Sequence, residues 1–109
     1  MGGSVRAVLV HGPSMVPTLR HGDAVLVRPG SARIRPGDVV VARFRTRPDL
    51  LVVKRAVRPY EGGWWLESDN ALVTDDSRAH GAADVLGRVV FRYLPLRRLG
   101  PITASRPDV

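Results

Sequence analysis

Glycine and proline interrupt this chain so often that no long helix fits between them. The sequence contains 11 glycines and 9 prolines in 109 residues, many of them in turn-forming combinations with aspartate or arginine. The runs between them are short and rich in valine, leucine and aromatic residues, which is typical of strands. Strands are predicted at residues 5–10, 24–27, 39–44, 50–57, 64–67 and 88–94. We therefore expect a mostly β fold, a single domain of short coiled antiparallel sheets or a partial barrel.

The length suits one domain with a single core. We expect this domain to span residues 1–95 and residues 96–109 to form a loose C-terminal tail, because proline, arginine and small residues replace the apolar alternation there. The chain has no cysteine, and its three histidines lack metal-ligand spacing, so neither a metal nor another cofactor is expected. No apolar stretch is long enough for a membrane span or a signal-peptide core, which predicts a cytoplasmic chain without a membrane anchor.

The charge of the chain is strongly positive, with a formal net charge of +7. Its arginines are scattered through predicted strands and turns, aromatic residues are few, and no zinc-finger, helix-turn-helix or RNA-binding pattern is present. We therefore favour an arginine-rich solvated surface and expect no nucleic-acid partner. A basic β module that binds nucleic acid remains the alternative of another class, and steeply salt-dependent binding would reveal it.

Ser14 lies in a segment that we call the serine loop, residues 11–19. Gly12 and Pro13 precede it and Pro17 follows, so this segment cannot become a helix or a central strand. The loop therefore presents the serine hydroxyl instead of packing it. Taken alone, such a serine is equally compatible with ordinary turn chemistry.

Lys54 interrupts the apolar run at residues 50–57 and is the only lysine among 17 basic residues. Strand alternation places it on the same face as Leu50, Val52 and Ala56. Burial among aliphatic side chains lowers the pKa of a lysine, whereas arginine stays protonated and cannot act as a base. Bringing a lysine pKa from about 10.4 to near 7 requires roughly 4–5 kcal/mol, which burial can supply. The alternative is an ordinary lysine that guards a sheet edge.

A serine hydroxyl becomes a good nucleophile when a base removes its proton, and a neutral lysine amine can serve as that base. We therefore hypothesise a catalytic dyad of Ser14 and Lys54. A serine–histidine arrangement with His11, His21 or His80 is the alternative, because sequence order does not restrict such constellations.

A third informative stretch, residues 68–78, is dense in aspartate, asparagine and hydroxyl side chains. Such residues hydrogen-bond to nearby backbone groups, which predicts a stiff loop. Asp76 and Arg78 could pair across a turn there. By itself this pattern favours a polar surface loop.

Five segments together resemble, in order, the boxes of the type I signal peptidase (S26) family of serine proteases. They are residues 14–19, 37–40, 53–55, 69–70 and 76–78, and the resemblance extends from about residue 10 to residue 93. It implies an all-β fold of coiled sheets, with Ser14 as the nucleophile and Lys54 as the general base. It also implies a structural loop near the site, formed by Asp69, Asn70, Asp76, Ser77 and Arg78.

Three positions depart from the pattern of that family. Gly12 stands where some members have a hydroxyl residue that assists the oxyanion, so the Ser14 N–H would carry more of that task. Ser68 stands where the family commonly has glycine. Thr74 stands where the family commonly has a serine whose hydroxyl orients the lysine amine, and Thr74 keeps a hydroxyl for this role.

Within the family, the short anchorless form most resembles the proteases that remove the N-terminal propeptide of the nickel superoxide dismutase precursor. This resemblance predicts a serine endopeptidase that acts on a precursor protein. A signal peptidase and a self-cleaving repressor-type peptidase are the alternatives; residues 37–43 and 53–55 are also similar to the latter. Met15 and Pro17 are weak candidates for the substrate groove, because an apolar residue beside a strand is more often part of the core.

Overall fold

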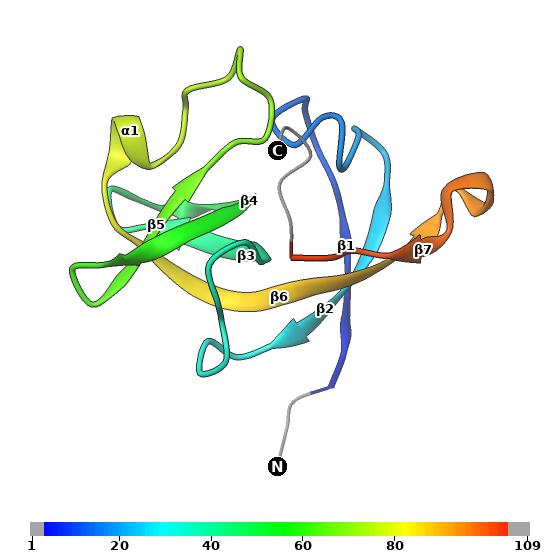
Figure 1. Ribbon diagram of the computed structural model, residues 1–109, viewed down its shortest axis with the longest axis horizontal. Helices are drawn as coiled ribbons and strands as arrows, with labels where there is room; N and C mark the ends of the chain where they lie inside the picture. Colours follow the sequence, from blue (N-terminus) through cyan, green and yellow to red (C-terminus); the bar gives the residue numbers. More distant parts are fainter. Residues whose placement is uncertain (1–3, 105–109) are drawn as a thin grey trace.

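The structure is a computed structural model that describes residues 4–104, and strands dominate it (Figure 1). The elements are β1 (Arg6–Leu9), β2 (Ala24–Pro29), β3 (Val39–Phe44), β4 (Arg47–Tyr60), β5 (Gly63–Glu67), α1 (Ser77–His80), β6 (Ala83–Leu94), a 3-10 turn η1 (Leu96–Arg98) and β7 (Gly100–Pro101). The predicted mostly β fold is confirmed. Within residues 4–104, no helix has the length and apolar character that crossing a bilayer requires.

The strands form one antiparallel sheet in the order β1-β2-β6-β3-β4-β5. β5 also pairs with β6, through Trp64 and Ala83, so β6, β3, β4 and β5 close into a small barrel. β1 and β2 extend the sheet on the other side of β6. In Figure 1, β6 (yellow) runs across the molecule and belongs to both halves. This arrangement agrees with the predicted partial barrel.

Two apolar clusters form the core, one in each half. β3 contributes to both, since Val39 and Val41 face one cluster while Val40 and Ala42 face the other. A strand that is apolar on both faces explains the uninterrupted apolar run at residues 39–42. The first cluster contains Val10, Met15, Leu19, Val25, Val27, Val39, Val41 and Val89, and the second contains Val40, Ala42, Phe44, Ala56, Leu66, Ala83 and Val85.

The six predicted strands are present, but two of them begin at least three residues earlier than predicted. β4 begins at Arg47 instead of residue 50, and β6 begins at Ala83 instead of residue 88. Gly87 lies inside β6, at a point where β2 and β6 approach closely. A Cβ at this position would lie 2.7 Å from the Arg28 carbonyl oxygen. The glycine therefore permits close strand packing instead of ending the strand.

Residues 96–103, which we expected to be part of a loose tail, contain two short elements of secondary structure. η1 follows β6 directly, and Pro101 of β7 pairs with Phe91. Ile102 packs against the first core cluster, and its N–H donates to the Val90 carbonyl at 3.0 Å. One apolar side chain and a two-residue strand are too short for periodicity to reveal. Residues 105–109 of the expected tail lie outside the described residues.

A buried polar network joins the segments that surround the site. Arg55 of β4 is fully buried, and its guanidinium donates to both Asp69 oxygens, at 3.0 Å from Nε and 2.6 Å from Nη2. Asp69 also accepts a hydrogen bond from the Thr18 hydroxyl at 2.6 Å, and Arg55 donates to the Gly37 carbonyl at 2.8 Å. The network therefore ties the serine loop to β4, to the turn before β3 and to the loop after β5.

Replacing Asp69 by asparagine should lower the free energy of unfolding by about 3–5 kcal/mol, because the variant leaves the Arg55 guanidinium buried without a counter-charge. The two side chains are 0% and 2% exposed. Asp84→Asn is the matched control: it removes a carboxylate from the Arg45–Asp84 pair, whose side chains are 42% and 59% exposed. That change should cost about 1 kcal/mol or less. Urea unfolding followed by circular dichroism measures both; equal losses would contradict the importance of the buried pair.

Candidate active site

The serine loop is held from both sides, so that Ser14 has a defined position. Met15 and Leu19, 1% and 0% exposed, anchor the loop in the first core cluster, while Ser14 itself is half-buried. On its other side, the loop is held by Asn70, whose backbone N–H donates a hydrogen bond to the Ser14 carbonyl at 2.9 Å. The side-chain amide of Asn70 donates a hydrogen bond to the Pro13 carbonyl at 3.1 Å. Figure 1 shows the loop after β5 arching beside the serine loop. The predicted presentation of Ser14 on a rigid loop agrees with this geometry.

Lys54 lies in the buried middle of β4 and is 5% exposed. It pairs with Val40 of β3, while Val52 and Ala56, on the same face, pack in the second core cluster. This agrees with the face predicted from alternation. Leu50, also predicted on that face, is 42% exposed because β4 extends beyond the barrel there.

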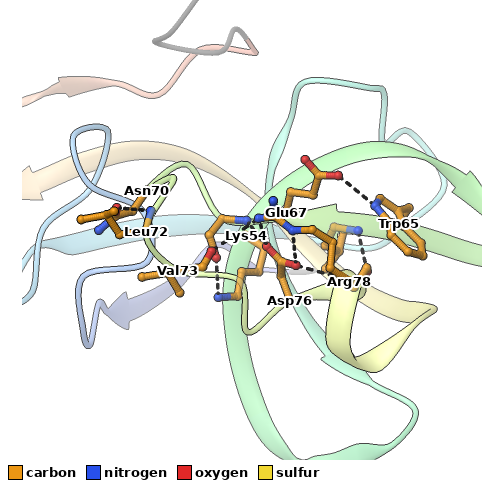
Figure 2. Close-up of polar contacts among 11 residues, drawn as sticks. Lys54, Trp65, Glu67, Asn70, Leu72, Val73, Asp76 and Arg78 are labelled. Atoms are coloured by element: carbon orange, nitrogen blue, oxygen red, sulfur yellow. Dashed lines mark hydrogen bonds and ion pairs between the residues drawn. The ribbon is translucent and has the colours of Figure 1, made fainter.

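Burial lowers the pKa of Lys54 below its ordinary value, because the charged amine loses hydration. The negative charges of Asp76 and Asp75 oppose this shift, and the positive charge of Arg78 reinforces it. Figure 2 shows Asp76 between Lys54 and Arg78 in this view. The Lys54 amine therefore loses its proton at a lower pH than a lysine in water does.

Ser14 and Lys54 line the same groove, which has a volume of about 530 Å³. Residues 7–10, from β1 and the residue that follows it, form one wall of the groove. Residues 50–54 of β4 form the other wall. The structure thus brings the two predicted catalytic residues to one site. Within the described residues, the Lys54 amine is hydrogen-bonded to Ser68 and not to Ser14. Catalytic hydrogen bonds are often formed only once a substrate is bound.

The hydroxyl that contacts the lysine amine belongs to Ser68. Lys54 Nζ donates to Ser68 Oγ at 3.0 Å, and both side chains are buried. Thr74, which we expected to orient the amine, is exposed. The Ser68 N–H donates to Asp76 at 2.8 Å, which fixes the position of the residue. A serine in place of the usual glycine therefore supplies the contact that we assigned to Thr74.

The loop that leads from β5 to α1 is stiff, as predicted. Asp76 caps α1 by accepting a hydrogen bond from the Arg78 N–H at 3.1 Å, and its carboxylate forms an ion pair with the Arg78 guanidinium at 2.8 Å. Burial opposes ionisation of Asp76, but the hydrogen bonds from Arg78 and from the Ser68 N–H lower its pKa below the ordinary value. The Ser77 hydroxyl accepts a hydrogen bond from the Leu66 N–H at 2.7 Å. These contacts hold the loop against β5, beside Lys54.

The remaining predicted residues have different roles. Gly12 adopts a φ of +80°, which favours glycine, and its N–H donates to His21 Nδ1 at 3.0 Å. Met15 lines the groove although it belongs to the core. Pro17 is exposed and is not among the residues that line the groove. Gly12 therefore contributes backbone conformation, and its N–H is already engaged.

Sequence reasoning missed a histidine–aspartate pair that also lines the groove. His80 Nε2 lies 2.6 Å from Asp75 Oδ1, its Nδ1 lies 3.2 Å from the Thr46 hydroxyl, and its ring stacks on Phe44 at 4.9 Å. The residues come from two distant stretches of the sequence, 44–46 and 75–80, so no local spacing signals the whole cluster. Both ring nitrogens of His80 therefore have partners other than Ser14.

Comparison with known proteins gives a consistent result. The chain matches the Peptidase S24-like family over residues 2–90. It is 32% identical to mitochondrial inner membrane protease subunit 1 of Xenopus tropicalis over 124 aligned residues, covering 90% of this chain and 74% of the relative. The Homo sapiens protein of the same name is 30% identical, with 90% and 75% covered. Mitochondrial ATP-independent inner membrane protease subunit 1a of Arabidopsis thaliana is 30% identical, with 85% and 73% covered. The chain therefore belongs to the Peptidase S24-like family and is a protease of the signal-peptidase type.

Proposed function

We propose that this chain is a serine endopeptidase with a Ser14–Lys54 dyad that removes an N-terminal propeptide from a precursor protein. The observation that carries the proposal is the environment of Lys54. The only lysine of the chain is 5% exposed, has a lowered pKa and lines the same groove as a serine presented by a rigid loop. The sequence resemblance favours the nickel superoxide dismutase precursor as the substrate.

In the first half of the reaction, the neutral Lys54 amine accepts the proton of the Ser14 hydroxyl. The Ser14 oxygen attacks the carbonyl carbon of the scissile peptide bond and forms a tetrahedral intermediate. The Lys54 ammonium then donates this proton to the leaving amine, and the carbon–nitrogen bond breaks. The products of this half-reaction are an acyl-enzyme ester on Ser14 and a free amino terminus on the matured protein.

In the second half, neutral Lys54 takes a proton from a water molecule, which attacks the ester carbonyl. Collapse of the second tetrahedral intermediate returns the proton to Ser14 and releases the propeptide as a carboxylic acid, which loses its remaining proton to solvent. The negative oxygen of both intermediates needs a hydrogen-bond donor. The Ser14 N–H suits this role, since no described residue accepts a hydrogen bond from it.

The groove suits an extended peptide. β1 is the terminal strand of the sheet order, and within the described residues it pairs on one side only, with β2. A substrate strand can therefore hydrogen-bond along the free edge of β1, in the manner of strand addition. Leu50 and Leu51 on the opposite wall are 42% and 44% exposed and offer apolar contacts. We therefore expect apolar side chains close to the scissile bond.

The test is mass spectrometry of a nickel superoxide dismutase precursor incubated with the wild-type chain, Ser14→Ala and Lys54→Arg. The wild type should release one defined N-terminal peptide, and each variant should be slower by about a thousandfold or more. Lys54→Arg is informative because it keeps the positive charge but cannot act as a base. Circular dichroism of each variant controls for folding.

The possible outcomes separate the mechanism from the substrate. Cleavage by Lys54→Arg at the wild-type rate would overturn the dyad. If the wild type left the precursor intact but a fluorophosphonate probe labelled Ser14, the substrate assignment would be wrong and the serine chemistry would stand. Cleavage of the chain only within itself would favour the repressor-type alternative.

The pH dependence of Ser14 acylation tests which hydroxyl positions Lys54. The rate should rise with pH as Lys54 loses its proton, with a midpoint below the ordinary lysine pKa of 10.5. Ser68→Ala removes a hydrogen bond that stabilises the charged amine, so the midpoint should move to still lower pH. The rate at its plateau should fall about tenfold, because the amine loses its orientation. The fluorophosphonate labelling rate, measured across the pH range, reports both quantities.

Thr74→Val is the matched control, since it removes a hydroxyl that is exposed. It should leave the midpoint and the plateau of the labelling rate unchanged. A shifted profile in Thr74→Val together with a wild-type profile in Ser68→Ala would return the positioning role to Thr74.

A further inference from the structure

A second cavity, of about 490 Å³, lies beside the start of β1 and the loop that follows β2. Three arginines line it: Arg28 from β2, Arg33 from the loop and Arg88 from β6. Val5 and Ile34 add apolar surface, and no described residue that lines the cavity carries a carboxylate. We call this cavity the arginine pocket.

The positive charges of the arginine pocket have no partner within the described chain. Arg28 and Arg88 are directly opposite each other on β2 and β6, an arrangement of like charges that destabilises a sheet. No described residue forms an ion pair or a side-chain hydrogen bond with either of them or with Arg33. Several arginines elsewhere form ion pairs with aspartates, as in the pairs Arg45–Asp84, Arg78–Asp76 and Arg98–Asp23. The pocket therefore concentrates uncompensated charge.

The pocket has a defined shape, because its loop is attached to the body of the protein. The Gly30 N–H donates to the Leu86 carbonyl of β6 at 2.8 Å. Ile34 packs against the second core cluster and thereby restrains the segment that carries Arg33. An anion would therefore bind to guanidinium groups that the fold has already positioned.

β1 connects the arginine pocket with the groove of the candidate active site. Val5, which directly precedes β1, lines the pocket, while residues 7–10 line the groove. A strand advances about 3.3 Å per residue, so a peptide that follows β1 passes from one cavity to the other within about five residues. A single extended polypeptide can thus occupy both.

We infer that the arginine pocket binds acidic side chains of the precursor polypeptide, at a distance of several residues from the bond that is cleaved. The fork of a guanidinium matches the two oxygens of a carboxylate, and such hydrogen bonds between charged groups are strong. The apolar walls at Val5 and Ile34 suit the aliphatic parts of glutamate and of its neighbours. This inference rests on the proposed function, because it takes the ligand to be the substrate.

The test measures binding without cleavage, by using the full chain with the Ser14→Ala change. The probes are a fluorescent peptide rich in glutamate and aspartate, flanked by leucine, and the same peptide with glutamine and asparagine in their places. Fluorescence anisotropy should show that the acidic peptide binds and that Arg28→Gln combined with Arg88→Gln weakens its binding about tenfold or more. The neutral peptide should bind more weakly and should not distinguish the proteins.

The matched control combines Arg43→Gln with Arg97→Gln. Both arginines are exposed, neither lines the arginine pocket, and the double change lowers the net charge by the same amount. This control should retain the affinity of the parent protein for the acidic peptide. Thermal unfolding checks the fold of both double variants; the pocket variant should be at least as stable as the parent, since it loses a like-charge pair.

Equal weakening in the two double variants would show general attraction to a basic protein and would overturn the inference. Absence of binding by the acidic peptide would overturn it as well. If inorganic phosphate stabilised the parent but the peptide did not bind, the pocket would be a site for a small oxyanion and the inference would be wrong. Selective loss in the pocket variant would support the inference even if precursor cleavage failed, so the two proposals fail separately.

Discussion

The buried ion pair between Arg55 and Asp69 is the interaction on which the site depends. A buried pair of this kind adds little net stability, because desolvation of both charges offsets their attraction. Its value here is geometric. Asp69 accepts a hydrogen bond from the Thr18 hydroxyl and so holds the serine loop. The next residue, Asn70, donates its N–H to the Ser14 carbonyl. The position of the serine is therefore set from β4, the strand that also carries the lysine.

Much of the site could be predicted from the sequence, because its signals are local. Glycine and proline define the serine loop, and alternation in β4 predicts the buried face of Lys54. The contact between Lys54 and Ser68 could not be predicted in this way. It depends on a β-bulge between residues 56 and 58, which sets the register in which Arg55 pairs with Glu67. Ser68 directly follows Glu67 and reaches Lys54 through its hydroxyl. No residue pattern in β4 or β5 indicates this shift of register.

The parts of the fold that escaped prediction are those defined by contacts between distant segments. The barrel closes through the pairing of Trp64 with Ala83, which neither segment signals alone. The first residues of β6 were not predicted, and Gly87 among them is required where β2 and β6 approach each other. Ile102 lies among proline and small residues and is positioned by one core contact and one backbone hydrogen bond. Periodicity detects none of these, because each depends on a surface formed elsewhere in the chain.

Lys54 and Arg55 are adjacent, buried basic residues of β4 that lie in opposite electrostatic environments. Alternation sends their side chains to different faces of β4. Arg55 meets the carboxylate of Asp69 in a paired arrangement that suits a permanent charge. Lys54 meets the neutral hydroxyl of Ser68, and burial lowers its pKa. A lysine at the first position and an arginine at the second are therefore not interchangeable. Arg55 keeps a permanent charge in a structural ion pair, whereas the proposed mechanism needs a Lys54 amine that can lose its proton.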